Sequence, residues 1–221
     1  FILSALFFCV LLMTIVSLPG DILAQAQVKD YNEINSLTGL PELPVNIGTF
    51  LGYAVTSIGD LDGDGVRELG VGAEDGIWII FPDTMGLAKS YTRINATTGG
   101  FAGVFDTDDQ FGTAIEAVGD LDGDGVDDIA VGAPLDDDGG SDKGAVWILF
   151  LYADGTVKSH QKISGTQGGF TGTLDAYDNF GISLGALGDL DGDGVEDLAV
   201  GVYNDDDGGS SRGAVYILFL N

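Results

Sequence analysis

The chain holds few of the side chains on which most enzymes depend for their chemistry. Its 221 residues include one cysteine, Cys9, and one histidine, His160. Cys9 lies inside an apolar N-terminal segment that we expect to be removed, so the mature chain can form neither a disulfide nor a thiol site. A histidine-based triad or zinc site would depend on His160 alone, which stands in an expected outer strand where catalysis is disfavoured. No position supports a nucleophile, and we expect no enzymatic activity.

Basic residues are scarce as well. Lysine and arginine together number 8 against 35 aspartates and glutamates, which gives a net charge of −27. Nucleic acid and anionic membrane surfaces attract basic proteins, so both are poor partners for this chain, and we expect it to bind no nucleic acid. The chain has only 5 prolines but 36 glycines, spread between short apolar segments. This composition is typical of an all-β chain rich in tight turns.

A single long apolar run is present, at residues 1–16. Pro19-Gly20 and then Ala24-Gln25-Ala26 follow it, which is the pattern of a secretory signal peptide cleaved before Gln27. We therefore assign residues 1–26 to a signal peptide and expect no membrane span in the mature chain. The alternative is an uncleaved anchor, for which the run is short, since a span needs ~20 residues. Residues 27–46 form a linker or an entry strand.

The chain contains one seven-residue string three times. D-L-D-G-D-G-V begins at Asp60, Asp120 and Asp189, and a further acid follows two residues after each valine. Alternating carboxylates set around glycines supply the oxygen ligands that calcium prefers. The glycine at position 6 permits a positive φ, which would aim the carbonyl of position 7 at the ion. Acids at positions 1, 3, 5 and 9 would complete the shell.

The predicted cofactor is therefore calcium, about one structural ion per repeat. Without a cation, four carboxylates held this closely would repel one another, so a solvated acidic turn is the weaker alternative. The predicted ligands are Asp60, Asp62, Asp64, the Val66 carbonyl and Glu68 in the first loop; Asp120, Asp122, Asp124, the Val126 carbonyl and Asp128 in the second; and Asp189, Asp191, Asp193, the Val195 carbonyl and Asp197 in the third.

An EF-hand is excluded by the residue at position 12. That loop requires a bidentate glutamate there, whereas this chain has Val71, Val131 and Val200. The valines belong to short apolar runs that read as buried strands. Each metal loop therefore joins two strands.

The repeat extends well beyond its loop. A strand is expected to open nine residues before each loop, at Leu51-Gly52, Phe111-Gly112 and Phe180-Gly181. Third strands are expected from Ile77, Val146 and Val215, and weaker fourth strands at 90–94 and 157–163. Four short antiparallel strands describe one blade of a β-propeller. Trp78, Trp147 and Tyr216 share one position in the third strand, which predicts core packing rather than a platform for sugars.

The loops are spaced 60 and then 69 residues apart. The nine extra residues fall between the second and third strands, where A-E-D-G in the first repeat becomes D-D-D-G-G-S-D-K-G in the second. Variation confined to one hairpin is typical of blades that keep their sheets. The acidic runs 136–138 and 205–207 are either solvated turns or sites for further cations.

The chain resembles the FG-GAP repeat family, whose repeats build the β-propeller of integrin α subunits. The signature residues are Phe111-Gly112 before the second calcium loop and Gly132-Ala133-Pro134 after it, and Phe180-Gly181 before the third calcium loop. Leu51 and Glu74 depart from the pattern in the first repeat, and Val202-Tyr203 departs in the third. The departures concern strand packing, because all three calcium loops match.

The resemblance implies a seven-bladed propeller, of which this chain would be a fragment. Blades are expected at about 47–105, 106–175 and, incomplete, 176–221. It also implies calcium ions on the lower face and partners on the upper face, although no motif marks a partner-contacting residue. We expect a secreted or cell-surface module for adhesion or for binding an extracellular protein or glycan. The alternatives are the non-catalytic part of a larger secreted hydrolase and a structural surface protein.

Overall fold

The computed structural model describes residues 28–34, 50–73 and 76–221. The chain divides into the units Phe1–Tyr31 and Asn32–Asn221, and every described strand lies in the second unit. The predicted signal peptide, Cys9, Glu74 and most of the predicted linker lie outside the described residues. The part of the linker that is described, residues 28–34, contains no strand. Within the described ranges, no helix has the length and apolar character needed to cross a membrane.

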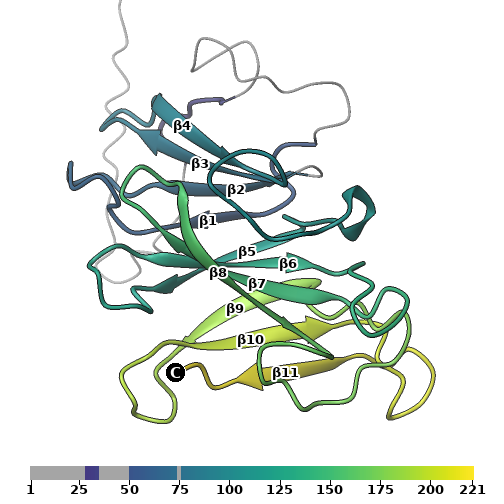
Figure 1. Cartoon of the computed structure of the whole chain (residues 1–221). Coiled ribbons are helices and arrows are strands. Elements are labelled where there is room, and N and C mark those ends of the chain that lie inside the picture. Colours follow the sequence, from purple (N-terminus) through teal and green to yellow (C-terminus); the bar gives the residue numbers. More distant parts are fainter. Residues whose placement is uncertain (1–27, 35–49, 74–75) are drawn as a thin grey trace, which may run out of the picture. The chain divides into compact units, whose positions relative to one another are not determined.

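Eleven strands of the described chain form three antiparallel sheets that follow one another in sequence (Figure 1). The first two sheets have four strands each, and the third has three. Their bounds are β1 Val55–Ser57, β2 Leu69–Ala73, β3 Gly76–Pro82 and β4 Ala88–Ile94; β5 Ala114–Gly119, β6 Asp128–Ala133, β7 Ala145–Leu151 and β8 Val157–Ser164; β9 Ser183–Gly188, β10 Asp197–Val202 and β11 Ala214–Leu218. A short 3₁₀ turn, η1 Thr107–Asp109, precedes β5. The all-β architecture of propeller blades is thus confirmed.

The central strands of each sheet are apolar on both faces, as their sequences predict. In the second sheet, Val131 of β6 pairs with Trp147 of β7, and both face a core shared with the first sheet. Ala130 and Ile148 are also partners, but they face a second core that is shared with the third sheet. Side chains alternate between the faces of a strand, so one strand contributes to two cores.

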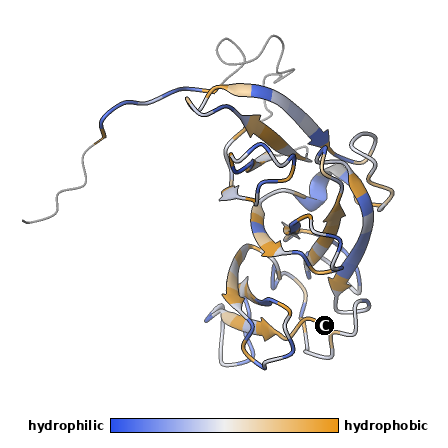
Figure 2. Cartoon of the chain, turned by 90° about the vertical axis from the view of Figure 1, so that its left-hand side faces the viewer, coloured by the Kyte–Doolittle hydropathy of each residue, from blue (hydrophilic) through white to orange (hydrophobic). Residues whose placement is uncertain are grey.

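Adjacent sheets therefore bury hydrophobic side chains between them. The core between the first and second sheets includes Ile77, Ile79, Phe111 and Trp147, and the strands carry most of the hydrophobic colour in Figure 2. The equivalent aromatic residues each lie in a hydrophobic cluster: Trp78 on the outer face of the first sheet, and Tyr216 at the edge of the core between the second and third sheets. The prediction that these three aromatics serve packing agrees with this arrangement.

The Phe-Gly pairs do not open strands as the sequence suggested. Phe111-Gly112 lies in a turn, and β5 begins only at Ala114. In that turn the Gly112 amide donates to the Gly132 carbonyl at 3.0 Å. Gly112 has a φ of 105°, so it is held in a conformation that L side chains avoid. The Phe111-Gly112 pair therefore forms a corner that fixes where β5 starts.

Each metal loop occupies the connection between the first two strands of its sheet. The string lies between β1 and β2, between β5 and β6, and between β9 and β10. The turn is closed on both sides by antiparallel pairing, such as Ser57 with Leu69. The sheets therefore hold both ends of each loop at a fixed separation.

Candidate metal centre

The backbone of the three loops has the form that the sequence predicts. The position-6 glycines Gly65, Gly125 and Gly194 have φ values of 88°, 91° and 95°. Their amides donate to the position-1 aspartates Asp60, Asp120 and Asp189 at 2.8, 2.8 and 3.0 Å. The other oxygen of Asp120 accepts the amides of Gly123 and Asp124, and that of Asp189 accepts the amides of Gly192 and Asp193, so these carboxylates also hold the turn closed. The chain reversal folds the acids of the loop toward a common centre.

Carboxylate oxygens gather within 4.8 Å of one another in every loop. The gathered groups are Asp60, Asp62, Asp64 and Glu68 in the first loop; Asp120, Asp122 and Asp128 in the second; and Asp189, Asp191 and Asp197 in the third. Asp124 and Asp193 remain outside their groups. Asp193 accepts the Val195 amide at 2.8 Å, as Asp64 accepts that of Val66 in the first loop. The ligand role of Asp124, of Asp193 and of the Val66, Val126 and Val195 carbonyls stays a prediction.

The position-9 acids are the buried members of the groups. Glu68 is 1% exposed, and Asp128 and Asp197 are fully buried. Asp128 accepts the Leu121 amide at 3.0 Å and, through its other oxygen, the Leu151 amide at 3.0 Å. Burial raises the pKa of Asp128 to about 6. The acid thus serves the protein as a link between the metal loop and the end of β7.

Glu68 tests whether the first loop fits a cation. Its Oε2 accepts the Leu61 amide at 2.5 Å, while its buried Oε1 has no hydrogen-bond partner. Burial and the neighbouring aspartates raise the pKa of Glu68, as expected for a carboxylate that lacks compensating charge. A buried, unpartnered carboxylate oxygen beside three other carboxylates suits a hard divalent cation. The donor set therefore fits calcium.

Two lysines lie against the loops, and the sequence reading missed them. Lys89 of β4 forms ion pairs with Asp62, at 3.4 Å, and with Asp64. Lys158 of β8 forms the equivalent pairs with Asp122, at 2.5 Å, and with Asp124. The sequence does carry a signal of this contact, because a lysine is the second residue of both fourth strands. The lysine lies 25 or more residues from its partners, so no local pattern indicates the contact.

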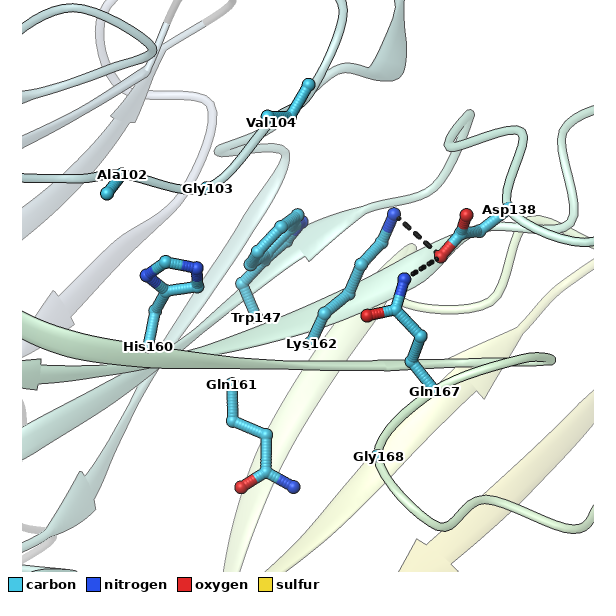
Figure 3. A pocket seen from close by; sticks show the side chains of 10 residues that line it. All are labelled: Ala102, Gly103, Val104, Asp138, Trp147, His160, Gln161, Lys162, Gln167 and Gly168. Carbon is cyan, nitrogen blue, oxygen red and sulfur yellow. Dashed lines mark hydrogen bonds and ion pairs between the residues drawn. The ribbon is translucent and has the colours of Figure 1, made fainter.

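His160 lies in a groove beside Trp147, where Figure 3 shows the surrounding side chains. Its ring centroid is 5.4 Å from that of Trp147 and 5.0 Å from that of Phe101, so the histidine packs on aromatic rings rather than standing free. Lys162 lies over the Trp147 ring at 5.1 Å and pairs with Asp138 at 3.0 Å. These contacts hold the acidic β6–β7 hairpin against β8. The side chains that line the groove thus pack on one another, and these contacts include no nucleophile paired with a base.

A family model described as FG-GAP repeat matches residues 111–149 and 180–218. Each matched range runs from the Phe-Gly turn through the metal loop to the third strand of its sheet. The first sheet falls outside the matched ranges, and its sequence departs from the signature at Leu51. The second and third sheets therefore carry the repeat.

Relatives extend the similarity over most of the chain. Integrin alpha-PS2 of Drosophila melanogaster is 32% identical over 181 residues, which cover 78% of this chain. Integrin alpha-2 of Mus musculus is 33% identical over 168 residues, or 70% of the chain. Phosphatidylinositol-glycan-specific phospholipase D of Bos taurus is 33% identical over 181 residues, or 76%. The aligned part spans only 12%, 13% and 20% of these three proteins.

Proposed function

Since this chain carries FG-GAP repeats and is similar to integrin α subunits over most of its length, we propose that it is a calcium-stabilised propeller module. The module acts in adhesion or in binding an extracellular protein or glycan, as a secreted or cell-surface protein. Calcium has a structural role in the loop between the first two strands of each blade. The chain itself performs no catalysis.

One observation carries the calcium assignment. Three loops far apart in the sequence each gather at least three carboxylates within 4.8 Å, and each carries one acid that is at most 1% exposed. Like charges this close repel one another strongly. A divalent cation turns that repulsion into attraction, and it would bring the buried Oε1 of Glu68 a partner.

Calorimetric titration of the full chain with calcium tests the proposal. We expect about three ions per chain with Kd values near ~10⁻⁴ to 10⁻³ M, which are typical of extracellular modules. At a free concentration of roughly 100 Kd, one site adds about 2.7 kcal/mol to the free energy of unfolding. For a domain of this size each kcal/mol moves Tm by about 2–4 °C, so a chelator should lower Tm by many degrees. An unchanged Tm would contradict a structural metal.

Removing one ligand tests the assignment of residues to sites. Asp122→Ala takes one carboxylate from the second group, so we expect that loop to lose affinity while the other two keep theirs. The same titration measures the number and the strength of the sites. Three unchanged sites would contradict the assignment.

The similarity to the phospholipase D favours a second candidate, in which these blades are the non-catalytic part of a larger secreted hydrolase. The two candidates differ in what the chain does alone. Under the first, the immobilised chain retains an extracellular protein or glycan in the presence of calcium and releases it with a chelator. Under the second, it retains none, and the activity belongs to a domain of a different kind.

A further inference from the structure

Two lysines reach the metal loops from the strand that closes each four-stranded sheet. Lys89 and Lys158 are each the second residue of that strand, β4 in the first sheet and β8 in the second. Both place Nζ between the acids at positions 3 and 5 of the loop in their own sheet. The same contact thus occurs in two repeats that differ in length and in the residues around it. Recurrence of this kind indicates a feature of the repeat rather than a chance surface pair.

The lysines contact the carboxylate oxygens that the loop backbone leaves free. Oδ1 of Asp64 accepts the amide of Val66 at 2.8 Å, and Lys89 contacts Oδ2. Oδ1 of Asp62 accepts an amide at 3.1 Å, and Lys89 again contacts Oδ2. A calcium ion held by positions 3 and 5 would use the same free oxygens.

The second loop repeats this division of the carboxylate oxygens at Asp124. Oδ1 of Asp124 accepts the amide of Val126 at 2.9 Å, and Lys158 contacts Oδ2. Lys158 also contacts Oδ2 of Asp122 at 2.5 Å. An ammonium and a divalent ion on the same oxygens would repel each other strongly, so the two cations exclude one another.

We infer that Lys89 and Lys158 are tethered cations that occupy the first and second loops when calcium is absent and that calcium displaces. The inference rests on the proposed calcium binding. In the absence of calcium each lysine offsets part of the repulsion between the loop acids and keeps the loop folded. In its presence the lysine competes, so these two loops bind calcium more weakly than they would without it.

Pulsed acetylation of lysines in the full chain, read by mass spectrometry, tests the displacement directly. We expect calcium to increase the modification of Lys89 and Lys158, because their amines leave the carboxylates. Lys162 is the matched control, since it pairs with Asp136 and Asp138 outside the metal loops; its modification should not change. Equal or lower modification of Lys89 and Lys158 in calcium would overturn the inference.

Calcium titration of Lys89→Met and Lys158→Met tests the competition. We expect one site in each variant to tighten by roughly two- to tenfold, since exposed ion pairs are weak, and the Tm in chelator to fall. Lys162→Met should lower the Tm without changing any calcium affinity. Weaker or unchanged calcium binding in the first two variants would refute the tethered cations while leaving the proposed function intact. A wild-type chain that takes up no calcium would refute the proposed function itself.

Discussion

At the scale of single residues, the acids of one loop have separate roles that depend on their depth. Asp128 is fully buried, and its two oxygens accept amides from Leu121 and Leu151. Asp122 lies at the exposed rim of the same loop and pairs with Lys158. Removing a buried acceptor leaves its donors without a hydrogen-bond partner, whereas an exposed ion pair contributes little to stability. The buried acid of the loop therefore builds the sheet in addition to facing the common centre, whereas the exposed Asp122 only faces that centre.

Asp128→Ala should accordingly destabilise the protein even without calcium. Two buried amides would lose their acceptor, which we expect to cost about 3 kcal/mol or more. The matched variant Asp122→Ala should cost about 1 kcal/mol or less under the same conditions. Urea unfolding in the presence of a chelator measures both values. Equal losses in the two variants would contradict the division of roles.

A second buried acid, outside the metal loops, makes stability depend on pH. Asp109 of η1 is 8% exposed, and burial raises its pKa from 3.8 to about 6, with a contribution from Asp136. The Asp106 amide and Lys162 act in the opposite direction. Between these two pKa values the folded state holds a proton that the unfolded state has released. The stability that this group contributes is present below pH 4 and is lost as pH rises through 6.

Asp109→Asn should flatten this dependence. The asparagine oxygen can still accept the Asp106 amide, and the side chain no longer ionises. We expect the variant to gain up to a few kcal/mol relative to the wild type between about pH 4 and 7. Urea unfolding across this range measures the difference. A constant difference between variant and wild type at all pH values would show that Asp109 does not titrate in this window.

At the scale of elements, two glycines set how closely neighbouring sheets approach. A Cβ at Gly132 of β6 would lie 2.0 Å from the carbonyl oxygen of Gly181, in the Phe-Gly turn of the third sheet. Gly72 of β2 meets the carbonyl of Gly112 at the same distance. The glycine in the second strand of a sheet, Gly72 or Gly132, thus leaves room for the Phe-Gly turn of the next sheet. This contact gives the spacing of the two motifs a physical cause.

Gly132→Ala should therefore force the second and third sheets apart. The clash is with backbone, which cannot rotate away, and we expect a loss of about 3 kcal/mol. Gly185→Ala in β9 is the control, since its Cβ would meet nothing within 4 Å, and it should change stability by less than about 1 kcal/mol. Thermal unfolding measures both. A tolerated alanine at position 132 would show that the sheets can separate freely.

At the scale of the whole molecule, the third sheet exposes a face whose equivalents in the first and second sheets are buried. Val215 and Ile217 of β11 are 69% and 51% exposed, whereas the equivalent Val146 and Ile148 of β7 are buried against the third sheet. Phe219 continues the exposed row. Contiguous apolar surface of this kind promotes association.

The 221-residue chain should consequently associate as its concentration rises. Replacing Val215 and Ile217 with lysine together should lower the mean mass, because charge opposes burial of that face. Size-exclusion chromatography with light scattering measures the mass. A wild-type chain that stays monomeric throughout would show that this face does not drive association.

Much of the fold followed from the sequence because its signals are local. Strand alternation, the glycine at position 6 and the valine at position 12 each act within one repeat. The sequence places the start of β5 too early, because the Phe111-Gly112 turn is fixed by a hydrogen bond to Gly132, which no local pattern reveals. In the candidate site, the acids could be read directly, whereas Lys89 and the amide of Leu151 come from strands that pairing alone brings to the loop.

The sequence by itself thus determined the repeat, the all-β sheets and the three acidic loops, since each depends on the chemistry of neighbouring residues. Only the tertiary structure decided which acids are buried, which carboxylate oxygen lacks a partner, and which lysines reach the loops. Those properties depend on the packing of β4 and β7 against distant segments. Burial sets the free energy of a charge, and burial is a property of the assembled sheets rather than of any segment alone.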